Sequence, residues 1–112
     1  MKLTIDKEVR GDALIIRLKG ELDHHTSEML KHELTEEIEK AGKRYFILSL
    51  RQLSFMDSSG LGVILGRYKQ IVNQGGKMIV CDANPSVYRL FELSGLFKIL
   101  TFQENEEMAL SN

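Results

Sequence analysis

The sequence predicts an α/β fold, a mixed β-sheet of four to five strands with an opening antiparallel hairpin and about four helices packed on it. Two alternating apolar segments open the chain and are joined by the turn Arg10-Gly11-Asp12, which is typical of a hairpin. Short apolar runs then alternate with segments of helical periodicity. This alternation favours right-handed crossovers and parallel pairing of the later strands.

The strands are predicted from the positions of their apolar residues. The first strand carries Leu3, Ile5 and Val9 on one parity, and the second, over 13–19, points Leu14, Ile16 and Leu18 inward. Segment 45–50 is apolar at nearly every position, as in a strand buried on both faces, and is therefore placed at the centre of the sheet. Segment 78–81 is a further buried strand, and 99–102 is expected to be an edge strand.

The first two helices are predicted from 3.6-residue periodicity. The first follows a polar loop over 20–25, has Asp23 or Thr26 available as its N-cap, ends at Gly42, and carries an apolar stripe of Leu30, Leu34, Ile38 and Ala41. The second runs over about 59–73, and its stripe consists of Leu61, Ile64, Leu65, Tyr68 and Val72.

Two shorter helices complete the prediction. Asn84-Pro85 is a strong helix start, with an N-cap residue followed by proline at the first helical position, and Gly95 closes that helix. Segment 104–110 is expected to be a terminal helix. Its acidic residues Glu106 and Glu107 suit the helix dipole and otherwise form solvated surface.

Length and composition indicate a single domain over 1–112. The 43% hydrophobic and 28% charged residues are ordinary for a globular protein, and the net charge of -1 gives no reason to expect nucleic acid or anionic lipid as a partner. No apolar signal region or membrane-length run is seen, so a cytoplasmic location without membrane contact is expected. Cys81 is the only cysteine, which excludes an internal disulfide and favours a buried thiol.

The most informative stretch is 55–62, Phe-Met-Asp-Ser-Ser-Gly-Leu-Gly, which stands directly before a helical run. The loops over 20–25 and 54–59 both follow a strand and precede a helix, so they are expected to form one surface at the same end of the sheet. Of the serines Ser58 and Ser59, one is a candidate N-cap and the other a candidate phosphoacceptor. Periodicity alone does not say which is which.

Other chemistries at this stretch are weighed against the serine pair. A hydrolase elbow requires Gly-x-Ser-x-Gly, but Met56 takes the place of the first glycine, and no catalytic triad emerges. Segment 60–66 loosely matches a dinucleotide fingerprint, with Asp82 near the position of a ribose-binding acid. A small nucleotide-binding protein or nucleotidase is therefore the alternative function, although close packing of the helix on the sheet explains the glycines better.

The loop before the first helix offers further polar groups. His24 and His25 are adjacent, but a metal site would need another ligand such as His32, and a solvated loop is the simpler interpretation. The functional interpretation is a recognition loop, in which Glu21 and Asp23 offer carboxylates to an arginine of a partner. No cofactor is expected.

Three segments carry a resemblance to a known family. These are Gly-Glu-Leu-Asp-His-His-Thr at 20–26, the stretch 53–69 that contains Asp-Ser-Ser-Gly, and Leu-Ser-Gly-Leu-Phe-Lys at 93–98. At their observed separation they closely resemble the anti-sigma factor antagonists of spore-forming bacteria, which are single STAS domains. The resemblance covers essentially the whole chain, shows no departure at the motif positions, and implies a regulatory protein that is not an enzyme.

The resemblance also implies partners and site residues. The partner is an anti-sigma factor with serine kinase activity, which the unphosphorylated protein binds so that a sigma factor is freed. Phosphorylation on Ser58 switches this binding off, and a serine phosphatase resets it. The docking surface includes Glu21, Asp23, His24 and His25, together with Asp57, Ser59 and Gly60 beside the acceptor. Sporulation is the expected context, and a STAS component of a general stress-signalling complex stays open.

A phosphate on Ser58 would act as a switch through its charge. It adds about -1.5 to -2 charges at pH 7. Free N–H groups at a helix start favour an anion, so the fold is expected to tolerate phosphoserine there. A partner surface that accepts a neutral hydroxyl would not tolerate it, and repulsion across the interface is sufficient without a change of fold.

Overall fold

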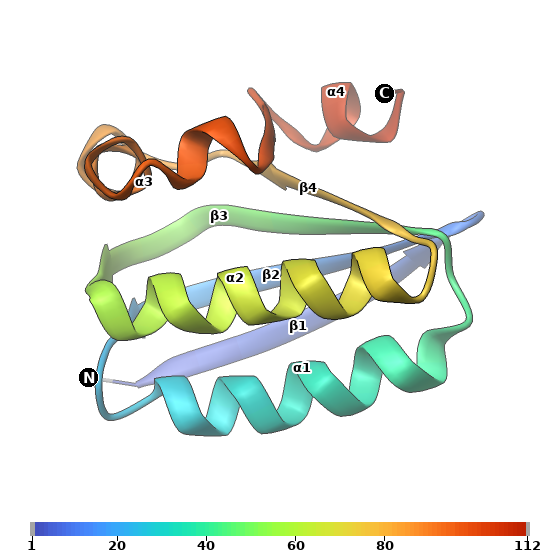
Figure 1. The fold of residues 1–112 in the computed structure, drawn as a ribbon, viewed down its shortest axis with the longest axis horizontal. Helices are drawn as coiled ribbons and strands as arrows, with labels where there is room; N and C mark the ends of the chain where they lie inside the picture. The colour runs from blue at the N-terminus through green and yellow to red at the C-terminus, as the bar shows by residue number, and fades with distance from the viewer. Residues whose placement is uncertain (1, 112) are drawn as a thin grey trace.

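The computed structural model describes residues 2–111 and contains one five-stranded sheet in the order β1-β2-β3-β4-β5 (Figure 1). The strands are β1 Leu3–Arg10, β2 Ala13–Leu22, β3 Tyr45–Met56, β4 Lys77–Cys81 and β5 Thr101–Gln103. β1 pairs antiparallel with β2, and all later pairs are parallel. The predicted mixed sheet with an opening hairpin and a central third strand is confirmed.

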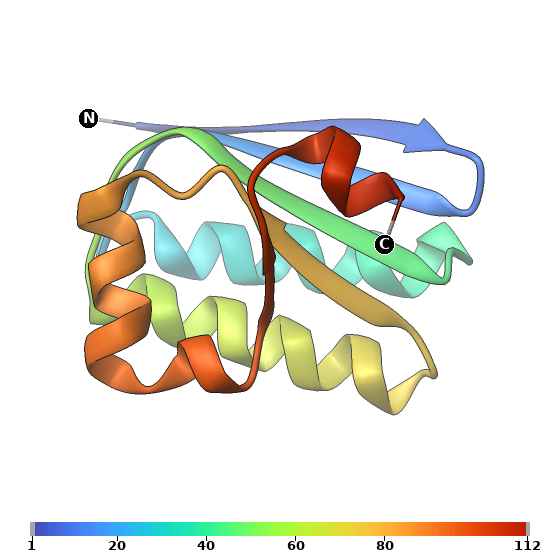
Figure 2. The same ribbon diagram turned by 90° about the horizontal axis from the view of Figure 1, so that it is seen from above.

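Four α-helices and one 3₁₀ turn pack on this sheet. They are α1 Ser27–Ala41, α2 Ser58–Asn73, α3 Pro85–Ser94, the turn η1 Leu96–Lys98 and α4 Glu106–Leu110. α1 and α2 lie side by side and run in the same direction, with both N-termini at one end of the molecule (Figures 1 and 2). They cover the larger hydrophobic core, to which α3 adds Val87 and Phe91. Each helix thus buries its apolar stripe against the sheet, as its periodicity requires.

The stop signals of α1 and α3 and the start signal of α3 act as predicted. Gly42 and Gly95 adopt the left-handed conformation directly after these two helices. The Asn84 side chain accepts a hydrogen bond from the N–H of Val87 at 2.8 Å, and Pro85 occupies the first turn. These signals depend on adjacent residues only, which is why the sequence reveals them.

Four elements have a boundary that differs from its predicted position by two or more residues. β2 extends to Leu22 and β3 to Met56, so both flanking loops are shorter than predicted. Gly20 lets β2 continue: its φ of +113° is one that other residues rarely adopt, and a Cβ there would clash with the carbonyl oxygen of Lys2. At the other end of the chain, β5 is 101–103 rather than 99–102, and α4 begins at Glu106 rather than 104 because Asn105 caps it.

Two residues predicted to face inward are exposed. Val9 is 59% exposed because it lies at the end of an edge strand, beside the hairpin turn. Val72 is 47% exposed, whereas its neighbour Ile71 is buried. Ile64 and Ile71 are seven residues apart on one face of α2, and the next residue along the chain is turned by about 100° from that face.

The opposite face of the sheet is covered by α4, which the sequence did not indicate. Ala109 packs there against a second apolar cluster that includes Ile15, Ile47 and Cys81. Burial, reinforced by the neighbouring Asp82, raises the pKa of the Cys81 thiol to about 12. The predicted burial of the Cys81 thiol is confirmed.

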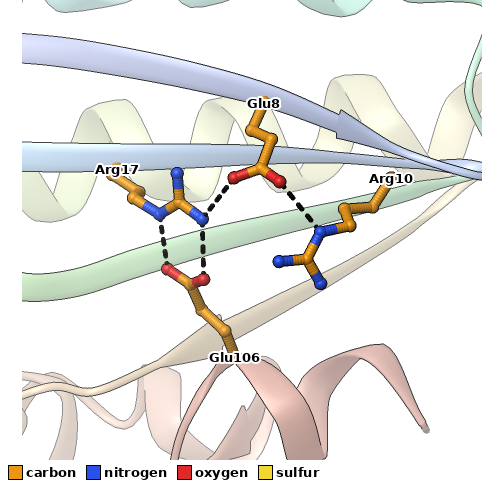
Figure 3. A network of polar contacts seen from close by, with 4 residues as sticks. All are labelled: Glu8, Arg10, Arg17 and Glu106. Carbon is orange, nitrogen blue, oxygen red and sulfur yellow. Dashed lines mark hydrogen bonds and ion pairs between the residues drawn. The ribbon is translucent and has the colours of Figure 1, made fainter.

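A charged network clamps α4 onto the sheet (Figure 3). The guanidinium of Arg17 donates from Nε to Glu106 Oε2 at 2.7 Å and from a terminal nitrogen to Glu106 Oε1 at 2.8 Å. The same terminal nitrogen donates to Glu8, which also accepts from Arg10. Glu106 is thus a structural ion-pair partner of β2, and the prediction that it is solvated surface is wrong.

Candidate functional site

The ends of β2 and β3 bring the two predicted loops together. The N–H of Asp57 donates to the carbonyl oxygen of Leu22 at 3.2 Å, so the parallel pairing continues to the last residue of β2. The N–H of His24 donates to Asp57 Oδ2 at 3.1 Å. Both loops lie at the end of the sheet where α1 and α2 begin (Figure 1). The expectation of one shared surface is confirmed.

Asp57 is the N-cap of α2, and neither serine is. Its backbone is extended, and its Oδ1 accepts hydrogen bonds from the N–H groups of Ser59 at 2.9 Å and Gly60 at 3.3 Å. Because Oδ2 also accepts from His24, one carboxylate satisfies the helix start and ties it to the other loop. The prediction that one of the two hydroxyls caps the helix is therefore wrong.

Both serine hydroxyls are left without a hydrogen-bond partner among residues 2–111. Ser58 is exposed at the first position of α2, and Ser59 is half-buried and faces toward α1. An exposed hydroxyl on a fixed backbone can be approached by another protein, whereas a half-buried one is partly screened. The hydroxyl of Ser58 is therefore more accessible to another protein than that of Ser59.

Asp23 organises the loop that precedes α1. Its Oδ1 accepts from the N–H groups of His25 at 2.8 Å and Thr26 at 3.0 Å, and the Thr26 hydroxyl donates to the carbonyl oxygen of Glu21. Burial raises the pKa of Asp23, but these hydrogen bonds outweigh it and lower the pKa overall. Thr26 stands at the N-cap position without capping a helical N–H. Asp23 thus holds the loop in shape, in addition to the partner contact predicted for it.

The histidines of this loop face outward. The rings of His24 and His25 are exposed and pack edge to face, with centroids 5.2 Å apart. Within residues 2–111 no group of three or more histidine, cysteine or acidic side chains is placed to hold a metal ion. The two rings are therefore available to a partner at the surface that also carries Ser58.

The glycines of α2 have two different roles. A Cβ on Gly60 would lie 2.7 Å from Cγ atoms of both Leu22 and Met56, so this position lets the helix pack closely on the strand ends, as predicted. Gly60 is buried beneath the surface that carries Ser58, so its predicted partner contact would have to be indirect. A Cβ on Gly62 or Gly66 would meet nothing within 4 Å, so close packing does not explain these two glycines.

The geometry does not assemble a dinucleotide site. Segment 60–66 lies inside α2, and the Asp57 carboxylate already occupies the N–H groups that a phosphate would use. Asp82 lines a hollow of about 640 Å³ on the α4 side of the sheet, together with Arg17 and Arg51, and none of the three glycines lines that hollow. The residues that suggested nucleotide binding are therefore not brought together.

The chain matches a known protein family over nearly its whole length. The model of the STAS domain family matches residues 4–109. The chain belongs to the STAS domain family. It is 54% identical over 111 residues to the anti-sigma F factor antagonist of Paenibacillus polymyxa, covering 99% of this chain and 95% of that relative. The chain therefore belongs to the STAS-domain anti-sigma factor antagonists, as the sequence resemblance predicted.

Solved STAS structures agree with this assignment. The anti-sigma factor antagonist SpoIIAA in its unphosphorylated form matches with a TM-score of 0.74 and 30% identity, covering 96% of each chain. SpoIIAA of Bacillus in the phosphorylated form matches with a TM-score of 0.73 and 33% identity, covering 96% of this chain and 97% of that one. Among residues 2–111 of the STAS domain described here, no helix combines the length and apolar character needed to cross a membrane.

Proposed function

We propose that this protein is an anti-sigma factor antagonist controlled by phosphorylation on Ser58. In its unphosphorylated form it binds an anti-sigma factor that is also a serine kinase, and so releases a sigma factor. Phosphorylation by that kinase ends the binding, and a serine phosphatase restores it. The protein acts as a binding module and a kinase substrate rather than as an enzyme. Because its partner regulates transcription, the protein is expected to act in the cytoplasm.

The observation that carries the proposal is the exposed, unpartnered hydroxyl of Ser58 on a fixed frame. Asp57 fixes the start of α2 from the preceding position and is itself bound to the His24 loop. In the transfer, Ser58 Oγ bonds to the γ-phosphorus of ATP, its proton passes to a base of the kinase, and ADP leaves. The substrate serine needs no base of its own, and none contacts its hydroxyl among residues 2–111.

The frame around Ser58 explains how a phosphate would change partner affinity. Asp57 already accepts from the N–H groups of Ser59 and Gly60, so these cannot absorb the new charge as the sequence suggested. The phosphate and the Asp57 carboxylate would then place about 2.5 to 3 negative charges together at the surface. Like charge or desolvation at an interface costs several kcal/mol, and each ~1.4 kcal/mol is tenfold in affinity.

This mechanism needs no change of fold. The phosphorylated and unphosphorylated forms of SpoIIAA resemble this chain almost equally, with TM-scores of 0.73 and 0.74. That similarity supports a switch that acts through surface charge. The high identity with an anti-sigma F factor antagonist favours the sporulation type of partner over a component of a general stress-signalling complex.

The test is incubation with ATP and the anti-sigma F factor of Paenibacillus polymyxa, with the phosphate located by mass spectrometry. We expect one phosphate on Ser58 of the wild-type protein, none on the Ser58→Ala variant, and an unchanged site in the matched Ser59→Ala variant. Phosphate on Ser58→Ala would make Ser59 the acceptor. If the wild-type protein is not phosphorylated and forms no complex, the proposed function is rejected.

A further inference from the structure

The contact between α1 and α2 is closed in its C-terminal half by two glutamines. The side-chain amide of Gln70 donates to the carbonyl oxygen of Thr35 at 3.0 Å. One helical turn later, the amide of Gln74 donates to the carbonyl oxygen of Ile38 at 3.2 Å. Residues four apart lie on one face of a helix, so a single stripe formed by α2 and its C-cap residue Gln74 holds α1 here.

The same stripe is open in its N-terminal half. The preceding members at four-residue spacing are Gly66 and Gly62, and no atom lies within 4 Å of a Cβ built on either of them. A groove of about 610 Å³ lies there between the two helices. It is also lined by Ser59 and His24, so it opens directly beside the candidate phosphorylation site.

Apart from His24, two of the three acidic or basic side chains that line this groove carry positive charge. Lys31 of α1 and Arg67 of α2 line it together with one carboxylate, that of Glu28. Neither cation forms an ion pair within residues 2–111, and the Nε of Arg67 donates only to the amide oxygen of Gln70, at 3.0 Å. Burial lowers the pKa of Arg67, and no carboxylate opposes this effect. A partly desolvated, unpaired guanidinium is costly for the isolated protein.

We propose that this groove, defined by Lys31, Arg67, Gly62 and Gly66, receives an acidic segment of the anti-sigma factor. A carboxylate of that segment pairs with Arg67, with Lys31 beside it, while the two glycines let its backbone approach α2 closely. Two observations favour this occupant: an acidic segment complements Lys31 and Arg67, and the groove also includes Ser59, beside the candidate phosphoacceptor. The inference rests on the proposed function, and it adds an anchoring contact that does not involve the phosphoacceptor.

The decisive variants are Arg67→Glu and a matched charge reversal outside the groove, Lys69→Glu. Lys69 is exposed on the same helix and does not line the groove. With the anti-sigma F factor of Paenibacillus polymyxa, we expect Arg67→Glu to weaken binding by about tenfold or more, and Lys69→Glu by less than about twofold. In steady-state phosphorylation, Arg67→Glu should raise KM and leave kcat unchanged, because Ser58 itself is untouched.

A second variant guards against misfolding. Gly66→Gln fills the groove where no atom opposes a new side chain, and it replaces glycine with a better helix former, so the melting temperature should hold or rise while binding weakens. Wild-type affinity in both Arg67→Glu and Gly66→Gln would overturn the groove assignment and leave the proposed function intact. Wild-type protein that neither binds nor is phosphorylated would overturn both. If the wild-type protein binds ATP or GTP, and Arg67→Glu abolishes this binding without changing partner affinity, the occupant of the groove is a nucleotide phosphate and not an acidic segment.

Discussion

Two regions of the molecule, the α4 side of the sheet and the start of α2, carry polar groups in opposite states. On the α4 side, the guanidinium of Arg17 is paired with both Glu8 and Glu106, and Ala109 of α4 packs on a buried apolar cluster. At the start of α2, the hydroxyl of Ser58 has no partner among residues 2–111, although the backbone below it is firmly bonded through Asp57. Groups that satisfy one another contribute to stability, whereas a fixed group without a partner remains available for binding or modification.

The strongest test of this contrast places a charge on the free hydroxyl. Ser58→Asp should lower affinity for the anti-sigma F factor by about 100-fold or more, because a desolvated like charge costs ~2.7 kcal/mol or more at an interface. The melting temperature should stay near that of the wild type, since Ser58 bonds to nothing that would be lost. Calorimetric titration and thermal unfolding measure the two quantities. A melting temperature lower by many degrees would instead indicate a conformational switch.

Alanine substitutions at two glycines of α2 should change the free energy of unfolding in opposite directions. Gly60→Ala should destabilise the fold by about 1–3 kcal/mol, because its Cβ would press on the buried side chains of Leu22 and Met56. Gly62→Ala meets open space and should stabilise the fold by up to about 1 kcal/mol through helix propensity. Urea unfolding of both variants provides the measurement. Equal effects at the two positions would contradict the distinct roles assigned to them.

The two helix caps separate stability from function. Asp57→Ala and Asn105→Ala each remove a side-chain cap and should each cost about 1 kcal/mol of unfolding free energy. Only Asp57→Ala also breaks the bond to the His24 loop, so only this variant should weaken partner binding. Denaturant titrations with parallel binding assays would check this. Weakened binding in Asn105→Ala would mean that α4 belongs to the interface.

The sequence is informative where structure depends on neighbours along the chain. Element order, the Asn84-Pro85 helix start and the Gly42 stop follow from local rules, and the candidate phosphoacceptor stretch is visible as a motif. The cap of α2 is not predictable in this way, because Asp57, Ser58 and Ser59 can all cap a helix. In the structure, the capping carboxylate of Asp57 also accepts a hydrogen bond from the N–H of His24, a contact between residues far apart in the sequence.

Long-range packing explains the other differences. Glu106 is 89 residues from Arg17, so its ion pair appears only when α4 folds over the outer face of the sheet. The groove is likewise not predictable from the sequence, because it forms only when α1 packs beside Gly62 and Gly66 of α2. The four-residue spacing of Gly62, Gly66, Gln70 and Gln74 is present in the sequence. Its role is evident only in the structure, where the two glutamines donate hydrogen bonds to α1 and the two glycines face open space.

The smallest expected effect is on the paired side of the molecule, and its dependence on pH identifies its origin. Arg17 lowers the pKa of Glu106 in the folded protein below the ordinary value of 4.5. The carboxylate therefore stabilises the fold fully above about pH 4.5, and this contribution is lost as the pH falls through the lowered value. Because the pair is partly exposed, Glu106→Gln should cost no more than about 1 kcal/mol at pH 7. Denaturant unfolding should show the variant and wild type converging in acid, while partner binding at pH 7 stays unchanged. A difference that persists at low pH would mean that the bidentate geometry, rather than the charge of Glu106, holds α4 in place.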